Sequence, residues 1–285
     1  MLIARCLLLA DATPTLRPLI PPRAITLTRR FLDQAAPSHR LDFALRHAWS
    51  RRLLLAVERF ALPGIIRHYL VRKQCIESHV RDFLHTHRDG QLVVLGAGLD
   101  TLAWRLQAQG TASSFELDHP ATQTLKRQAN IQPAPHLLPV DFTGDCPAAA
   151  LATLAGYSSA KPTVFVAEGL LMYLPTERVA ELLSALARAT VADSRLVFTF
   201  MERRPNQSLG FRGGHRLVTA WLRWKREPFL WGEDRAMLAT FLARHGWTLE
   251  KLGSPQELRE RFLIAPEHIG QPLAEGECIA IANRA

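Results

Sequence analysis

The stretch VVLGAGLDTLAWRL, residues 93–106, joins a short apolar run, a Gly-Ala-Gly break and a segment with helical spacing. A strand that leads into a glycine turn and then a helix exposes backbone N–H groups at the carboxyl end of a sheet, where open α/β folds bind ligands. Gly96 and Gly98 are therefore candidate binding residues. An ordinary strand-to-helix turn has the same pattern, so residues elsewhere must decide between the two interpretations.

Two phosphate-binding motifs do not fit this turn. The dinucleotide fingerprint GxGxxG requires a third glycine where Thr101 stands, and no lysine follows as in GxxxxGK[ST]. Glu116 and Asp118 end the next predicted strand about 20 residues downstream, where an acidic side chain accepts hydrogen bonds from both ribose hydroxyls. The pattern favours a ribose-containing ligand without a pyrophosphate, and S-adenosylmethionine fits that description.

Short runs of β-forming residues alternate with helical segments along the chain, which is typical of βαβ units and a parallel sheet. We therefore predict an α/β fold: a Rossmann-like doubly wound sheet of about seven strands that closes with an antiparallel pair. The predicted strands are 92–95, 114–117, 136–140, 163–167, 196–201, 247–252 and 277–282.

Helical spacing predicts helices over 41–60, 71–85 and 233–245, and another after Pro175. Thr176 is expected to cap that last helix. Its expected buried stripe is Val179, Leu182, Leu183 and Leu186.

Domain organisation follows from these elements. The prolines at 14, 18, 21 and 22 predict an extended arm over the first two dozen residues. We predict an N-terminal arm and helical cap over 1–88 and a doubly wound α/β core over 89–285. Within the core, an inserted lid over 202–232 carries Trp221, Trp224 and Trp231 among arginines.

The net charge of +9 is concentrated near the N-terminus, since residues 1–90 hold 15 Lys and Arg against 7 Asp and Glu. A basic layer of this kind could attract an anionic substrate, nucleic acid or a membrane surface, or could be a solvated arginine-rich face. The chain has no aromatic-interleaved RNA-binding signature and no zinc finger, so nucleic acid is not the expected partner.

Several other classes are disfavoured by composition. The four cysteines are far apart and lack metal-ligand spacing, which predicts free thiols and no metal site. No apolar run approaches the roughly 20 residues of a membrane span. The apolar run after Arg5 is shorter than a signal-peptide core of roughly 7–15 residues, so we expect a cytoplasmic protein.

Acidic residues follow two further predicted strands. Asp141 and Phe142 come after the third strand, where a carboxylate and a ring suit an adenine. Glu168 comes after the fourth strand, where the sheet order is expected to reverse and where a negative charge suits an ammonium and a sulfonium. Each acid alone could equally be a helix-dipole partner, but acids at the ends of three successive strands together favour a ligand.

Four segments together carry a resemblance to a known family: LGAGLDTLAWRL (95–106), FELDHP (115–120), VDF (140–142) and AEGLLMYL (167–174). The chain resembles the class I S-adenosylmethionine-dependent methyltransferases related to leucine carboxyl methyltransferase, with their bacterial O-methyltransferase relatives. The resemblance covers about residues 66–200 well and continues more weakly to the closing strands. It implies S-adenosylmethionine as the cofactor.

The resemblance implies roles for single residues, and it leaves one role unplaced. The family also uses a basic residue near its N-terminus for the cofactor carboxylate, for which Arg23, Arg29 and Arg30 are candidates. The implied roles are Arg72 for the cofactor carboxylate, Gly96, Gly98 and Asp100 at the turn, Asp118 beside Glu116 for the ribose, Asp141 and Phe142 for the adenine, Glu168 for the amino-acid end, and Tyr173 at the methyl-transfer chamber.

The resemblance implies that the methyl acceptor is an oxygen, the carboxylate or hydroxyl of a small molecule or a peptide end. The segment AEGLLMYL stands where methyltransferases of base amino groups carry Asn-Pro-Pro-Tyr. A carboxylate acceptor needs no base, whereas Tyr173, His119 or a histidine of 202–232 could assist a hydroxyl. The alternatives are an NAD(P)-linked oxidoreductase, which Thr101 disfavours, and a non-catalytic S-adenosylmethionine-binding protein.

Overall fold

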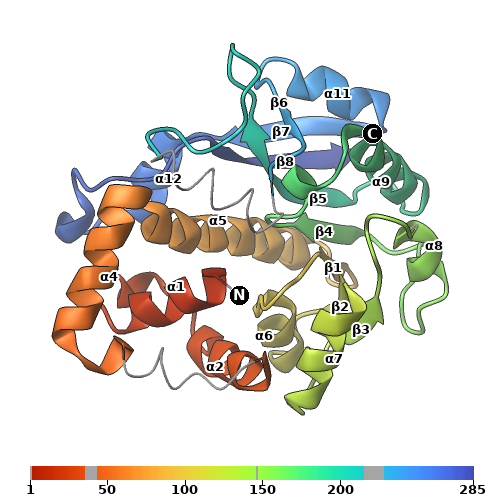
Figure 1. Cartoon of the computed structure of the whole chain (residues 1–285). Coiled ribbons are helices and arrows are strands. Elements are labelled where there is room, and N and C mark those ends of the chain that lie inside the picture. The colour runs from red at the N-terminus through yellow and green to blue at the C-terminus, as the bar shows by residue number, and fades with distance from the viewer. Residues whose placement is uncertain (1, 36–43, 146, 215–227) are drawn as a thin grey trace.

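An eight-stranded sheet forms the centre of the computed structural model, which describes residues 2–35, 44–145, 147–214 and 228–285 (Figure 1). The strand order is β3-β2-β1-β4-β5-β8-β7, and the two-residue β6 pairs with β5. Strands β1 to β5 run parallel, while β8 is antiparallel to both β5 and β7. The predicted parallel sheet with an antiparallel closing pair is confirmed. The strands are β1 Gln91–Leu95, β2 Ser113–Asp118, β3 His136–Pro139, β4 Thr163–Ala167, β5 Arg195–Glu202, β6 Gly232–Glu233, β7 Trp247–Gly253 and β8 Glu277–Arg284.

The central strands are apolar throughout because both of their faces are covered. Every residue of β1 is buried. Leu92 and Val94 pack into the core on one face of the sheet, and Val93 and Leu95 pack into the core on the other. This is the pattern of a parallel sheet with helices on both sides.

Helices cover both faces of the sheet (Figure 1). One core contains residues of α1, α5, α6 and α12, and the other contains residues of α9 and α11. The helices are α1 Leu2–Asp11, α2 Ala24–Ala35, α4 Ala48–Ala61, α5 Ile65–Thr86, α6 Leu102–Ala108, α7 Pro120–Gln128, α8 Pro147–Ala152, α9 Thr176–Arg188, α11 Leu238–Arg244 and α12 Pro255–Phe262, with 3-10 turns η1 Arg17–Leu19, η2 Leu171–Tyr173 and η3 Pro266–His268.

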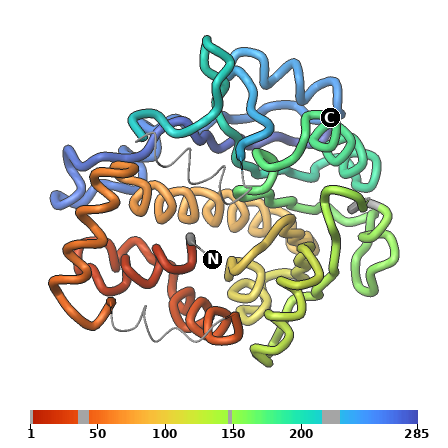
Figure 2. Tube along the Cα trace, viewed as in Figure 1, coloured from red at the N-terminus to blue at the C-terminus, as the bar shows by residue number. Residues whose placement is uncertain are grey.

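The predicted extended arm at the N-terminus is wrong. Residues 2–11 form α1, with Ala4, Leu7 and Leu8 buried in the core, and α2 begins at Ala24. The prolines start at Pro14, so they restrict only the connection between the two helices. Figure 2 shows the start of α1 close to the turn that follows β1.

Helix α5 begins at Ile65, six residues earlier than predicted. Gly64 precedes it with a φ of 77°, and a Cβ there would lie 2.4 Å from the Pro272 carbonyl oxygen. The glycine therefore permits both the sharp turn out of α4 and a close approach to the 272–273 backbone. Helix α4 overlaps the predicted helix over 41–60 from residue 48 onward and ends one residue beyond it, and residues 41–43 lie outside the described residues.

The helix after β4 matches its prediction except at its first residue. Val179, Leu182, Leu183 and Leu186 of α9 are buried. Thr176 is already helical, Pro175 holds the cap position with extended backbone, and no side chain caps the helix. The expected cap at Thr176 is therefore wrong, because a proline can occupy this extended position directly before the helix.

The described parts of the predicted lid are 202–214 and 228–232, and Trp221 and Trp224 lie outside the described residues. Trp231 is fully buried and packs against Phe200 and Phe241. Trp231 therefore belongs to the core, and the lid stays a prediction. The predicted domain boundary at residue 88 also stays a prediction, although α5 packs directly on β4 and β5.

Candidate functional site

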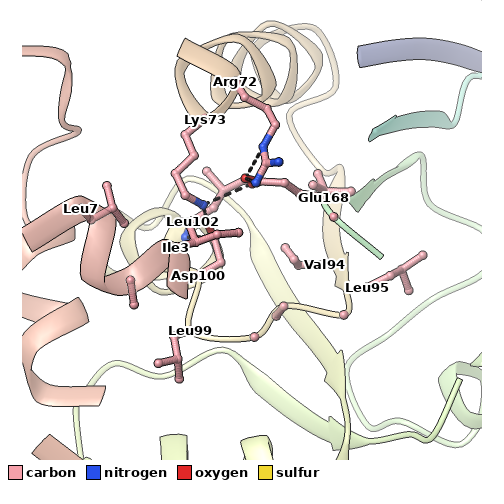
Figure 3. A pocket seen from close by; sticks show the side chains of 16 residues that line it. Ile3, Leu7, Arg72, Lys73, Val94, Leu95, Leu99, Asp100, Leu102 and Glu168 are labelled. Atoms are coloured by element: carbon pink, nitrogen blue, oxygen red, sulfur yellow. Dashed lines mark hydrogen bonds and ion pairs between the residues drawn. The ribbon is translucent and has the colours of Figure 1, made fainter. Parts of the chain in front are cut away.

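A cavity of about 180 Å³ lies beside the point where the strand order reverses, between β1 and β4 (Figure 3). Its lining comes from the turn after β1, from α5, from the end of β4 and from one side of α1. Ile3 and Leu7 of α1 close it opposite the glycine turn. Open α/β sheets bind ligands at this position.

The two glycines of the turn have different reasons to be glycine. Gly96 has a φ of 61°, and a Cβ there would lie 2.8 Å from the Leu170 side chain. Gly98 has a φ of 51°, and a Cβ there would meet nothing within 4 Å. Since Gly98 lines the cavity, its lack of a side chain leaves open space above the turn.

Arg72 of α5 is held by carboxylates from two strands. Its Nε and Nη2 donate to Glu168 Oε1 at 2.9 and 2.6 Å, and its Nη1 donates to both carboxylate oxygens of Glu277 at 2.7 Å. His68 Nε2 lies 2.9 Å from Glu277 Oε2. Burial opposes the charge of Glu277, yet Arg72 and His68 lower its pKa to about 2. The cluster therefore stays ionised although it is buried.

Lys73 extends this cluster to the glycine turn. Its Nζ forms ion pairs with Asp100 and with Glu168, the latter at 3.2 Å (Figure 3). Burial disfavours its charge, but Asp100 and Glu168 raise the pKa of Lys73 above its usual value. Asp100 Oδ1 also accepts the backbone N–H of Leu102 at 2.6 Å, at the start of α6. The turn and α5 are thereby joined by a charged pair at the cavity wall.

Five ionised side chains thus meet at this end of the site. Two are cations and three are carboxylates, so these five side chains carry a net charge of −1, and His68 is not counted among them. The members are Arg72, Lys73, Asp100, Glu168 and Glu277.

Asp118 lies at the carboxyl end of β2, on the other side of the glycine turn. Its carboxylate accepts the backbone N–H of Gly98 and, at 2.6 Å, the backbone N–H of His119. It is 9% exposed and does not line the cavity itself. The contact with Gly98 nevertheless places this carboxylate directly beside the turn.

Asp141 and Phe142 follow β3 and do not line the cavity. Asp141 accepts hydrogen bonds from the backbone N–H and the hydroxyl of Thr143, at 2.9 and 2.7 Å, and these bonds lower its pKa. The side chain of Phe142 is buried in the core on the α9 face of the sheet. Their assignment to an adenine stays a prediction.

Glu116 is not brought to the cavity. It is fully buried, 2.7 Å from Lys126 Nζ and 3.3 Å from Trp104 Nε1, while its Oε1 has no hydrogen-bond partner. Burial outweighs the attraction of Lys126 and raises the pKa of Glu116 to about 6. Trp104 belongs to α6 and Lys126 to α7, so these contacts favour a role for Glu116 in holding the two helices on the sheet.

Tyr173 lies in η2, five residues after Glu168. Its ring centroid is 5.6 Å from that of Phe229, which lies 6.1 Å from Phe211, and Phe211 lies 6.0 Å from the ring of His68. A row of aromatic rings therefore leads from Tyr173 to the residue that contacts Glu277. The catalytic role of Tyr173 stays a prediction.

Sequence reasoning missed three parts of the site: Lys73, Glu277 and α1. Lys73 directly follows Arg72, and Glu277 is the one acidic residue of the strand ECIAIANR, so both carried a signal. The candidate arginines Arg23, Arg29 and Arg30 are exposed and do not line the cavity. In the part of the chain that the structure describes, no group of three or more His, Cys, Asp or Glu could hold a metal ion, and no helix could span a membrane.

Comparison with known proteins gives related chains and folds. The model of the family described as leucine carboxyl methyltransferase matches residues 15–187. A protein of Mycolicibacterium paratuberculosis, provisionally named an S-adenosyl-L-methionine-dependent methyltransferase, is 35% identical over 63% of this chain and 58% of its own length. A protein of Mycolicibacterium smegmatis with the same name is 29% identical over 75% of this chain and 68% of its own length. The chain thus spans under two thirds of the first of these relatives.

A solved structure from Thermobifida fusca, provisionally described as a methyltransferase, superposes with a TM-score of 0.59. It covers 82% of this chain and 88% of its own, at 15% identity. The likeness supports the fold described above.

Proposed function

The chain belongs to the leucine carboxyl methyltransferase family, and from this premise we propose that it transfers a methyl group from S-adenosylmethionine to a carboxylate or hydroxyl oxygen of a small molecule or a peptide end. One observation carries the proposal: Arg72, Lys73, Asp100 and Glu168 line one cavity beside the strand-order reversal, and Glu277, outside that lining, pairs with Arg72. No pyrophosphate-binding pattern accompanies the turn, because Thr101 replaces the third glycine.

The charges of this group fit S-adenosylmethionine. The amino-acid end of that ligand carries an ammonium, a sulfonium and a carboxylate, and the cavity wall offers both carboxylates and cations to pair with them. Gly98 leaves open space beside Asp118 for a sugar. When bound, the sulfonium supplies an electrophilic methyl group with a good leaving group.

The residues of the chain would then divide the work. Arg72 already donates to Glu168 and Glu277, so a ligand carboxylate would have to share it. Lys73 lies on the cavity wall next to it, and we assign the ligand carboxylate to Lys73 together with Arg72. Glu168 faces the ammonium, and Asp118 accepts from the ribose hydroxyls.

The acceptor would bind beside Glu168, along the aromatic row that includes Tyr173 and Phe229. Aromatic rings favour an acceptor with an apolar body. Transfer is an in-line displacement, so alignment of the acceptor oxygen supplies most of the acceleration. A carboxylate is nucleophilic without a base, and for a hydroxyl we assign orientation of the oxygen to the Tyr173 phenol.

Titration calorimetry with S-adenosylmethionine, S-adenosylhomocysteine, adenosine and NADH tests the ligand class. We expect binding of the first three and none of NADH. Binding of NADH without S-adenosylmethionine would overturn the proposal in favour of an oxidoreductase.

The acceptor class needs a second experiment with methyl-labelled S-adenosylmethionine and separate pools of carboxylic acids, phenols and peptides. Methyl esters release labelled methanol in mild base, whereas methyl ethers do not, so the label distinguishes carboxylate from hydroxyl acceptors. Transfer to amines alone would contradict an oxygen acceptor. Cofactor binding without transfer to any pool would favour a non-catalytic binding protein.

A further inference from the structure

Helix α4 presents an apolar face to the solvent. Five of the nine large apolar side chains that are exposed in the described chain lie on this one helix, including Trp49 at 61%, Leu53 at 56% and Phe60 at 69% exposure. Residues 49, 53, 56 and 60 follow the spacing of a single helix face, and Val57 adjoins them. We call Trp49, Leu53, Ala56, Val57 and Phe60 the α4 stripe.

The opposite side of α4 holds the helix on the protein. Ser50 is buried, Arg51 Nη1 turns back to the Leu45 carbonyl oxygen at 2.7 Å, and Leu55 packs against the core. Glu58, the one acidic residue of α4, is half-buried and hydrogen-bonds the backbone at Ile66. The stripe therefore points outward because the polar contacts of the helix are made on its inner side.

The edge of the stripe is basic. Arg52 and Arg59 are exposed and seven residues apart, so they lie along one side of the helix next to the apolar residues. Arg46, just before the helix, is also exposed. A helix with Trp, Phe and Leu on one face and arginines beside it has the composition of helices that lie in the headgroup region of a bilayer.

From this arrangement we propose that α4 docks the protein on an anionic membrane surface, with the α4 stripe among the acyl chains and Arg52 and Arg59 among the headgroups. Aromatic residues near both ends of the helix suit the interface between water and lipid. The surplus of basic residues over 1–90 adds attraction to anionic lipid. Helix α4 leads through Gly64 into α5, which carries Arg72, so the docking helix is joined directly to a helix of the candidate site.

Charge and size argue against a second copy of the chain as the occupant. Two stripes paired antiparallel about a two-fold axis would bring their arginine edges, which carry like charge, close together. The helix is about 21 Å long at 1.5 Å per residue, so its stripe covers much less than the roughly 800 Å² per partner of a stable interface.

Vesicle flotation tests the proposal, with vesicles of phosphatidylcholine alone and of phosphatidylcholine mixed with phosphatidylglycerol. We expect the wild type to float with the mixed vesicles and much less with the neutral ones. The double variant Leu53→Glu/Val57→Glu should bind the mixed vesicles at least about tenfold more weakly, because two apolar side chains that insert into the bilayer become charged. Arg52→Glu/Arg59→Glu should lose the preference for the anionic vesicles.

Met237→Glu and Arg244→Glu are the matched controls, since both side chains are exposed at the two ends of α11, away from α4 (Figure 1). They should float like the wild type. Thermal unfolding of every variant checks the fold independently of cofactor binding and methyl transfer, so failure of the proposed function leaves this test intact.

Three outcomes would overturn the proposal. The first is a wild type that floats with neither kind of vesicle, and the second is an equal loss of flotation in the Met237→Glu control. The third is a wild-type dimer in solution that Leu53→Glu/Val57→Glu dissociates, since the stripe would then be a contact between copies.

Discussion

The two ends of the candidate cofactor site are held in different ways. At the amino-acid end, Arg72, Lys73 and three carboxylates from α5, β4, β8 and the glycine turn pair with one another. At the nucleoside end, Asp118 and Asp141 accept hydrogen bonds from groups at the turn or in their own loops. Breaking the first end should therefore cost stability and binding together, whereas breaking the second should cost binding alone.

The largest effect is expected from Arg72→Met. Arg72 is 2% exposed, and its removal leaves Glu277 buried without its main counter-charge. Loss of one partner of a buried pair costs about 3–5 kcal/mol in the free energy of unfolding. Urea unfolding followed by tryptophan fluorescence should show this loss, and calorimetry should show loss of S-adenosylhomocysteine binding.

The double variant Arg72→Met/Glu277→Met separates stability from binding. Removing both charges should restore most of the stability, because the apolar pair has no buried charge to compensate, but it should not restore ligand binding. Arg195→Met, in a pair with the more exposed Glu250, is the control and should change stability by about 1 kcal/mol or less. Equal losses of unfolding free energy in Arg72→Met and in the double variant would show that the unpaired charge of Glu277 is not the cause of the instability.

At the nucleoside end, Asp118→Asn should weaken S-adenosylhomocysteine and adenosine alike. Loss of charged hydrogen bonds is worth about 1.5–3 kcal/mol, or roughly 10- to 100-fold in Kd. The unfolding free energy should change by less than this, because the amide oxygen can still accept the N–H of Gly98. Unchanged adenosine affinity in calorimetry would remove Asp118 from the ribose site.

Glu116 sharpens the comparison, since it precedes Asp118 by two residues but should act on stability alone. Its folded-state pKa of about 6 lies above the ordinary 4.5, so the folded state binds more protons between these values. The stability that protonated Glu116 provides is therefore complete below pH 4.5 and lost as the pH rises through 6. The difference corresponds to about 2 kcal/mol.

Urea titrations from pH 4.5 to 7 should show this loss in the wild type and not in Glu116→Gln. Glu250→Gln, at an exposed pair, should keep the wild-type slope. Glu116→Gln should leave the Kd for S-adenosylhomocysteine unchanged at neutral pH. A tenfold weaker Kd in a folded Glu116→Gln protein would return Glu116 to the binding site.

The sheet could be predicted because its signals are local. Strands β1 and β4 are short apolar runs bounded by turns, and the acids Asp118 and Glu168 stand where β2 and β4 end. Parallel strands meet at one edge, so their ends converge whatever the details of packing. Arg72, Gly96, Gly98, Asp100 and Glu168 accordingly meet at one cavity.

Other features of the site depend on contacts between residues far apart in the sequence and could not be predicted from local patterns. Periodicity places Glu116 and Asp118 on the same side of β2, and only the packing of Lys126 and Trp104 shows that Glu116 is enclosed. Glu277 reaches Arg72 from 205 residues away. The prolines at 14, 18, 21 and 22 restrict the chain only after α1, so they carry no information about residues 2–11.

The smallest effect is expected from Lys73→Met, which tests how the amino-acid end treats a ligand carboxylate. Lys73 is the cation that pairs with both Asp100 and Glu168, and Arg72 remains to hold Glu168 and Glu277. The affinity for S-adenosylhomocysteine should therefore fall about tenfold, or about 1.4 kcal/mol, while adenosine, which has no carboxylate, should bind as before. Lys73→Arg should keep most of the affinity, and Lys251→Met, at an exposed pair with Glu257, should change neither ligand. If the affinity for adenosine falls as much as that for S-adenosylhomocysteine, Lys73 supports the glycine turn through Asp100 and does not bind the ligand carboxylate. The ligand carboxylate would then have to share Arg72 with Glu168 and Glu277.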